Sequence, residues 1–215
     1  MTDTTKTVSG FSGVVAPVLF VVVFTIFGFF HKDYSAVSMF VSALSLGSSG
    51  WIQIANFMVF GLLSSLFATR VAAMFSGKAS MAGPIFLSLS ALCFFLSGPF
   101  VMDPMGTAQT ATSSHGTVHG VLGAVAFLLM PTACFVFYGS FSKDKSWHFF
   151  KGWTLAAAIV TSCTVVFFSV VSKDPSYIPV FSPWFGLIQR SVIVPYMAWL
   201  FAFAAVAYWK VPRRR

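Results

Sequence analysis

The stretch "HGTVHGVLGAVAFLLMPTACFVFYGSF", residues 115–141, decides the fold class, because it contains no Asp, Glu, Lys or Arg. About 20 apolar residues are enough for an α-helix to cross the hydrocarbon core of a bilayer. A membrane-spanning β-strand would instead be a segment of about ten residues with alternating polarity. The stretch therefore predicts a transmembrane helix, and this helix opens on two histidines four residues apart.

The composition of the whole chain supports the same prediction. Of the 215 residues, 57% are hydrophobic and 8% are charged, and all five acidic residues are Asp. A soluble domain carries about 25% charged residues, so a chain this apolar could not cover its surface in water. The formal net charge is +8. Because the basic residues are scattered over the connections, we expect the lipid bilayer as partner, and no nucleic acid.

Six apolar segments are long enough to cross a bilayer, and they predict an all-α, six-helix transmembrane bundle of three helical hairpins. Residues 1–215 are expected to form a single transmembrane domain without a separate soluble domain. The first segment is too long for the core of a cleavable signal peptide, so we expect it to remain as a span. The predicted spans are residues 10–30, 51–75, 81–101, 115–141, 153–172 and 185–208.

The Lys and Arg residues of the connections predict the orientation of the bundle. Of the 13 such residues, ten lie on the side of the two chain termini. An excess of basic residues marks the cytoplasmic side. We therefore predict a multi-pass protein of the cytoplasmic (inner) membrane, with both termini in the cytoplasm and the loops 31–50, 102–114 and 173–184 outside. The ten residues are Lys6, Arg70, Lys78, Lys143, Lys145, Lys151, Lys210, Arg213, Arg214 and Arg215.

Polar and ionisable residues gather near the predicted outer ends of the spans. Such groups are costly within a membrane and therefore point to a functional site. Arg190 has three alternative roles: it pairs with Asp103 or Asp174 as a clamp of the bundle, it binds an anionic headgroup through its guanidinium, or it reaches to the interface. We expect a polar pocket that opens outward, with the ligand-binding residues Gln53, Asp103, His119, Gln189 and Arg190.

His115 and His119 are candidate metal ligands, because residues four apart share one face of a helix. Neutral imidazole is a good ligand for zinc, and Asp103 could supply a third ligand. Three protein ligands leave one position open for water, which would permit hydrolysis of a lipid-like bond. The residue after His115 is Gly116, however, where the zincin motif has its Glu. Haem is not expected, because two histidines on one helical turn cannot bind opposite faces of one iron.

The glycines of this stretch support a structural alternative. A GxxxG spacing makes one side of the helix small and lets a neighbouring helix approach closely. His115 and His119 would then only form hydrogen bonds with Asp103, with a backbone carbonyl or with residues of the last span. The small residues are Gly116, Gly120, Gly123 and Ala124.

Four parts of the chain resemble a known family. They are "DYSAVSMFVSALSLG" (33–47), "WIQIANFMVFGLL" (51–63), "GPFVMDPM" with "HGTVHGVLGAVAFL" (98–105 and 115–128), and "GLIQRSVIVPYMAWL" (186–200). Together they extend from the first outer loop to the last span. In these parts the chain resembles the bacterial and archaeal membrane proteins catalogued as domain of unknown function 998.

The resemblance implies the six-span fold and the place of the polar cluster. Family members commonly carry an Asp after the third span, histidines that open the fourth, and a Gln-Arg-like pair in the sixth. Asp103, His115, His119 and Arg190 stand at those places here. Many members have an acidic residue after the Ser of the first outer loop, where this chain has Ala43. No reaction follows from the resemblance.

The sequence is compatible with three functions. The first is the binding of a small molecule or of a lipid headgroup, for example of an anionic lipid, without catalysis. The second is a metal-dependent hydrolase with a lipid-like substrate. The third is a small-molecule transporter, which is disfavoured because the polar residues in the middle of the spans are mostly Ser, Thr and Cys. The sequence assigns no catalytic residue, cofactor or protein partner.

Overall fold

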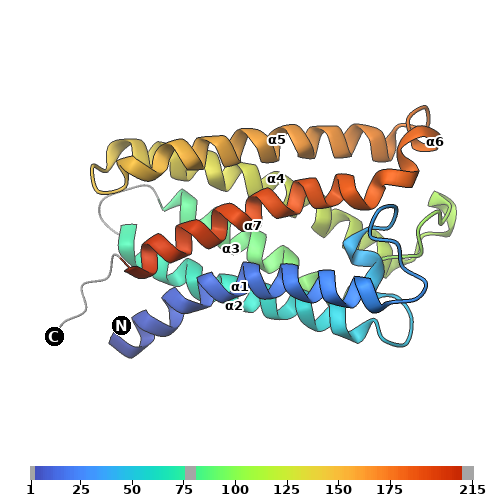
Figure 1. Ribbon diagram of the computed structural model, residues 1–215, viewed down its shortest axis with the longest axis horizontal. Helices are drawn as coiled ribbons and strands as arrows, with labels where there is room; N and C mark the ends of the chain where they lie inside the picture. Colours follow the sequence, from blue (N-terminus) through green and yellow to red (C-terminus); the bar gives the residue numbers. More distant parts are fainter. Residues whose placement is uncertain (1–2, 76–80, 210–215) are drawn as a thin grey trace.

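The computed structural model describes residues 3–75 and 81–209, with side chains from Val8 onward, and this part of the chain is helical without strands. Short turns of helix lie in the connections, namely η1 (Val41–Ser45), η2 (Gln109–Ala111), η3 (His148–Phe150), α6 (Ile178–Phe181) and η4 (Ser182–Trp184). The long helices run along one common axis (Figure 1). They are α1 (Asp3–Phe30), α2 (Trp51–Phe75), α3 (Ala82–Leu96), α4 (Ser114–Lys143), α5 (Lys151–Lys173) and α7 (Phe185–Trp209).

Five helical segments of the described residues are long and apolar enough to cross a membrane, which is typical of a multi-pass membrane protein. The shorter apolar helix is α3, with 15 residues. At about 1.5 Å per residue it is about 22 Å long, less than the hydrocarbon thickness of about 30 Å. The five segments are Val8–Phe30, Trp51–Phe75, Ser114–Lys143, His148–Lys173 and Ile178–Trp209.

Within the third predicted span, residues 81–101, the helix is shorter than the apolar segment. The helix ends at Leu96, because Pro99 lacks an N–H and disfavours the helical conformation of the residue before it. That residue is Gly98, where an added Cβ would lie 3.0 Å from the carbonyl oxygen of Ile54. The sequence remains apolar after the helix has ended, so the hydropathy overestimates the helix length.

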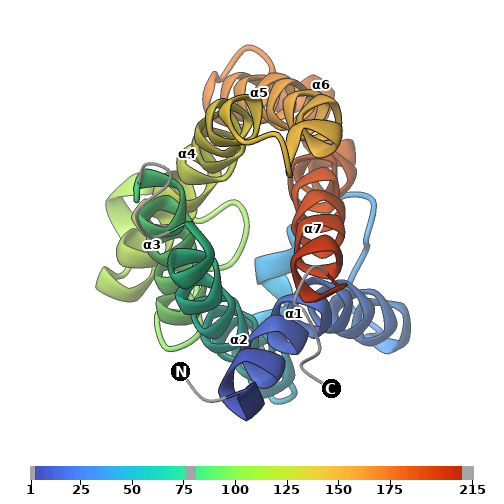
Figure 2. The same cartoon turned by 90° about the vertical axis from the view of Figure 1, so that its left-hand side faces the viewer.

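The long helices of the described chain form a closed ring in the order α1, α2, α3, α4, α5, α7 and back to α1 (Figure 2). Each connection joins helices that are neighbours in the ring, so successive helices are antiparallel. One end of the ring is where α1 begins and α7 ends, and we call it the terminus end. The opposite end carries η1, η2 and α6, and we call it the loop end (Figure 1).

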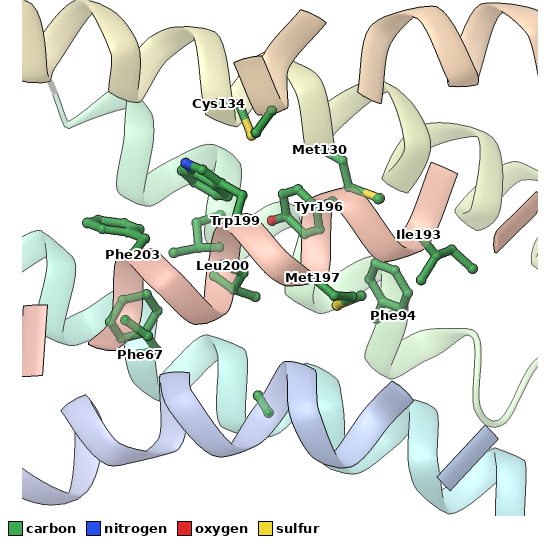
Figure 3. Packing of buried hydrophobic residues seen from close by; sticks show 14 of the residues in the cluster. Phe67, Phe94, Met130, Cys134, Ile193, Tyr196, Met197, Trp199, Leu200 and Phe203 are labelled. Atoms are coloured by element: carbon green, nitrogen blue, oxygen red, sulfur yellow. The ribbon is translucent and has the colours of Figure 1, made fainter. Parts of the chain in front are cut away.

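An aromatic core fills the terminus end of the ring. The rings of Phe137 and Phe203 are 4.8 Å apart between centroids, and those of Phe141 and Trp147 are stacked at 4.9 Å. Trp199 is fully buried, and its indole N–H donates to the hydroxyl of Thr154 at 3.1 Å. Figure 3 shows Phe203 of α7 close to Phe67 of α2, with Trp199 on the other side of Phe203. The aromatic core consists of Phe67, Phe75, Phe137, Phe141, Trp147, Phe150, Trp199 and Phe203.

At the loop end, the connection of residues 31–50 folds back against the ring (Figure 1). Its η1 turn is largely buried, so its backbone groups need partners inside the protein. The side-chain oxygen of Gln189 accepts the N–H of Val41 at 2.7 Å. The N–H of Leu187 donates to the carbonyl of Val37 at 3.0 Å. The first turns of α7 therefore hold this connection in place.

Candidate ligand-binding cavity

A cavity of about 420 Å³ lies inside the loop end of the ring. Its wall is made by η1, α2, α3, α4, α5, α7 and the connection before α4. Small-molecule sites have volumes of about 300–1,000 Å³ and are mostly apolar with a few polar groups. This cavity matches both properties. Its polar lining residues are Ser42, Ser97, Asp103, Thr107, Thr112, His119, Ser169, Lys173 and Gln189.

His119 lies one turn into α4 and lines the cavity, where it interacts with the backbone of Phe100 and of Ser97. Its side chain is 8% exposed, and Nδ1 lies 2.7 Å from the carbonyl oxygen of Phe100. A carbonyl oxygen only accepts, so Nδ1 carries the hydrogen and donates it. In the neutral imidazole, Nε2 is then an acceptor. His119 can therefore receive a hydrogen bond from a hydroxyl or amine of a ligand.

Asp103 lies next to the start of α4 and lines the cavity. Its Oδ2 accepts the N–H of Ser113 at 2.8 Å, and the Ser113 hydroxyl oxygen accepts the N–H of Gly116 at 3.0 Å. A carboxylate at a helix N-terminus is stabilised by the helix dipole. A Cβ on Gly116 would collide with the Asp103 carboxylate. The glycine is therefore required for the close approach of Asp103.

Two further glycines of α4 border the cavity. A Cβ added to Gly120 or Gly123 would meet no atom within 4 Å, and both residues line the cavity together with Ala124. In the structural alternative offered by the sequence, this small side packs against a neighbouring helix. The structure differs from that alternative, because Gly116 receives a carboxylate, and Gly120 and Gly123 leave room beside the helix.

The predicted metal ligands do not form a ligand set in the structure. Over residues 3–75 and 81–209, no three His, Cys, Asp or Glu side chains are arranged to hold a metal ion. His115 is exposed in the first turn of α4, with its ring 5.5 Å from that of Phe100. His119 and Asp103 are bonded to backbone groups as described above. A zinc site of His115, His119 and Asp103 stays a prediction that this arrangement does not support.

Arg190 holds the 31–50 connection against α7. One guanidinium nitrogen, Nη1, donates to the carbonyls of Ala36 at 2.8 Å, Met39 at 3.3 Å and Gly186 at 2.9 Å. The other, Nη2, donates to the hydroxyl of Tyr34 at 2.6 Å. Of the three roles predicted for Arg190, these bonds support the clamp, with loop carbonyls as partners in place of an Asp carboxylate. Arg190 is not part of the cavity wall.

Tyr34 is the partly buried partner of this clamp. Burial raises the pKa of its phenol, while the hydrogen bond from Arg190 and the positive charge of that residue act in the opposite direction. The Tyr34 hydroxyl also lies 3.2 Å from the carbonyl oxygens of Met39 and Phe40. The tyrosine and the arginine therefore fix the same segment of the loop.

The two predicted glutamines differ in their position. Gln189 lines the cavity, and because its oxygen accepts the Val41 N–H, its amide NH₂ remains as a donor. Gln53 is fully buried outside the cavity wall. Its oxygen accepts from Asn56 at 3.2 Å, while its Nε2 has no hydrogen-bond partner. Three of the five predicted ligand-binding residues therefore line the cavity, namely Asp103, His119 and Gln189.

The cavity also contains residues that the sequence did not assign to a site. Lys173, at the end of α5, lines the wall, and so do Ser97 and Ser169. A Lys in a connection and a Ser in an apolar helix are both common in membrane proteins. Neither could therefore be recognised from the sequence as part of a binding site. Only the ring arrangement of the helices brings them close to Asp103 and His119.

One protein family matches most of the chain. The model described as "Protein of unknown function (DUF998)" matches residues 14–206. The chain belongs to this family. The match covers every helix that contributes to the cavity of this DUF998 protein, and it confirms the resemblance seen in the sequence. No curated protein and no solved structure showed significant similarity to the chain. The function must therefore be argued from the cavity.

Proposed function

We propose that this DUF998 protein binds a small molecule or a lipid headgroup in the loop-end cavity, without catalysis. The observation that carries the proposal is the cavity itself. It is mostly apolar, and it is lined by His119, whose Nδ1 donates to the carbonyl of Phe100. Asp103 lies in the connection before α4 and Lys173 is the last residue of α5, whereas Phe94 and Ile193 lie within α3 and α7. This order of polar and apolar groups suits an amphipathic ligand.

The proposal includes a place for the protein in the cell. We propose six spans in the cytoplasmic membrane, where α3 and the apolar residues after it make the third crossing, with the termini inside and the cavity outside. The excess of Lys and Arg on the terminus side supports this orientation. Among those residues, the side chains of Lys6, Lys78, Lys210 and Arg213–Arg215 lie outside the part that the structure describes.

The two alternative functions have less support. A metal-dependent hydrolase needs a ligand set, and His115, His119 and Asp103 are not grouped as one. A transporter needs a path to the other side of the membrane. The aromatic core fills the terminus end of the ring, so transport would require a rearrangement of residues such as Phe203 and Trp199. Binding requires no rearrangement.

A pair of glycine substitutions in α4 tests the proposal. Gly120→Leu places a side chain into the cavity. Gly139→Leu is the control, because it places the same side chain on the same helix but outside the cavity. At both positions an added Cβ would have no atom within 4 Å. Native mass spectrometry of protein released from membranes in mild detergent measures the small molecules that remain bound. We expect wild type and Gly139→Leu to carry a bound molecule that Gly120→Leu loses. Identical spectra for the three proteins would contradict the proposal.

A further inference from the structure

The chemistry and the location of the cavity wall identify the class of ligand. We propose that the ligand is an uncharged acyl ester with a free hydroxyl, of the monoacylglycerol type, and that its chain enters sideways between the outer halves of α4 and α5. This inference rests on the proposed binding function and specifies its ligand.

The side entrance follows from the course of the two helices. Toward the loop end, α4 and α5 lie apart from each other (Figure 1), and the cavity is lined by both of them. From α4 it is lined by Gly120, Ala124 and Leu128, and from α5 by Val165 and Ser169. Leu128 is 62% exposed although it lines the cavity. The cavity therefore reaches the outer surface of the ring at this height.

The surface around this entrance is apolar. Val121 and Val125 are exposed on α4, and Val166 and Val170 are exposed on α5. In a helix bundle that spans a bilayer, such side chains face the hydrocarbon tails of lipids. A lipid chain can pass from there into the cavity without leaving an apolar environment. A molecule without a chain would have no such route.

Two glycines of α4 leave open space at the proposed entrance. Gly120 and Gly123 leave the side of α4 without a Cβ, and no atom lies within 4 Å of where either Cβ would be. Glycine residues in membrane helices often serve close helix packing, but these two glycines have no helix against them. The room that they leave belongs to the cavity.

Two polar groups of the cavity wall, His119 and Gln189, define the headgroup of the proposed ligand. The Nε2 of His119 accepts, so it suits a hydroxyl donor. The amide NH₂ of Gln189 donates, so it suits an ester carbonyl. A hydroxyl beside an ester carbonyl is the polar part of a monoacylglycerol. His119 is more than nine-tenths buried, so a hydrogen bond in this place counts more than one at an exposed site.

The charges of the wall disfavour an anionic headgroup. The charged lining residues are Asp103 and Lys173, which have opposite signs. Arg190, the residue that the sequence offered as an anion ligand, is bonded to the 31–50 connection. The cavity therefore has no excess positive charge with which to bind a phosphate. This favours an uncharged headgroup over the anionic lipid that the sequence suggested.

Two substitutions of His119 distinguish its hydrogen bond to the Phe100 carbonyl from the proposed hydrogen bond to the ligand. In His119→Asn the amide nitrogen takes the place of Nδ1, so the bond to Phe100 is kept while the acceptor toward the cavity is lost. In His119→Gln the amide lies farther along the side chain, nearer to the position of Nε2. We expect His119→Asn to weaken the binding of monooleoylglycerol at least about tenfold, and His119→Gln to weaken it less.

Ala124→Trp tests the side entrance. Ala124 is exposed at the edge of the cavity on α4, and Ala156 is exposed on α5 outside the cavity, so Ala156→Trp is the matched control. We expect the first substitution, and not the second, to abolish the binding of monooleoylglycerol. Binding is measured by native mass spectrometry of the purified full-length protein in nonionic detergent.

The choice of probes separates this inference from the proposed function. The probes are monooleoylglycerol, the water-soluble monobutyrylglycerol and dioleoylphosphatidylglycerol. We expect one molecule of monooleoylglycerol to bind, and the other two to bind at least about tenfold more weakly. Equal or tighter binding of phosphatidylglycerol overturns the uncharged headgroup, and equal binding of monobutyrylglycerol overturns the chain entrance, while the proposed function stands in both cases. If no probe binds and no molecule co-purifies with wild type, both proposals fail.

Discussion

The two ends of the ring are built from the same helices but are filled differently. At the terminus end, Phe137 and Phe141 of α4 are fully buried in the aromatic core. At the loop end, Gly120 and Gly123 of the same helix border a cavity of about 420 Å³. Helix packing in membranes depends on close van der Waals contact, because lipid tails are as apolar as the side chains. One end can therefore supply the packing that stabilises the bundle, which leaves the other end free to hold a ligand.

The largest effect is expected in the aromatic core. Phe203 is fully buried, and its ring packs against those of Phe67 and Phe137. Phe203→Ala should lower the free energy of unfolding by about 3–5 kcal/mol, because it leaves a void in a packed core. Phe201→Ala, on the same helix but 41% exposed, should cost less than about 1 kcal/mol. Equilibrium unfolding in mixed micelles measures both, and equal losses would show that the core is not packed as described.

The next largest effect is expected at the clamp of the 31–50 connection. Arg190→Lys keeps the charge but loses the forked donor geometry that reaches several carbonyls and the Tyr34 hydroxyl. The loss should cost about 2 kcal/mol, because hydrogen bonds from a charged group are worth about 1.5–3 kcal/mol. Hydrogen–deuterium exchange of residues 34–45 should become faster, and less so in Tyr34→Phe. Unchanged exchange in Arg190→Lys would show that the clamp does not hold the loop.

A smaller effect is expected where Asp103 meets α4. In Gly116→Ala the new Cβ would collide with the Asp103 carboxylate, so the carboxylate must move away from the Ser113 N–H. The protein should lose about 1 kcal/mol of stability, as for a helix that loses its cap. Gly139→Ala is the control on the same helix, since its Cβ would contact no atom. If thermal denaturation is the same for both variants, Asp103 does not lie where the structure places it.

The smallest effect, of opposite sign, is expected at the cavity. Gly120→Ala adds a Cβ that meets no atom within 4 Å, and Ala is the better helix former by up to about 1 kcal/mol. The substitution should therefore leave the stability unchanged or raise it slightly in the same thermal denaturation. A clear destabilisation would mean that a neighbouring helix packs on Gly120, as in the structural alternative from the sequence.

The sequence predicted the class of the fold well, because long apolar runs report directly on helices. It did not show where α3 ends, because the chain stays apolar through residues 97–101 although the helix ends at Leu96. It also identified Asp103, His119 and Gln189, which line the cavity. The partners of Arg190 were not predictable, since they lie on a loop that folds back from more than 140 positions away in the chain.

The glycines of α4 show why the cavity itself could not be predicted. The spacing of Gly116, Gly120 and Gly123 is the same whether a helix, a carboxylate or a ligand lies against it. A glycine in the sequence shows only that there is no side chain at that position, and not which group lies against it. What takes its place is decided by the course of α5 and by the connection that carries Asp103. These are features of the tertiary structure, and no local sequence pattern indicates them.

The binding of monooleoylglycerol to wild type, Gly120→Leu and Gly139→Leu, measured side by side by native mass spectrometry, tests the central claim most directly. If the loop-end cavity is the ligand site, wild type and Gly139→Leu each bind one molecule, and Gly120→Leu binds at least about tenfold more weakly. Equal binding by the three proteins would show that the lipid binds elsewhere, and would contradict the account.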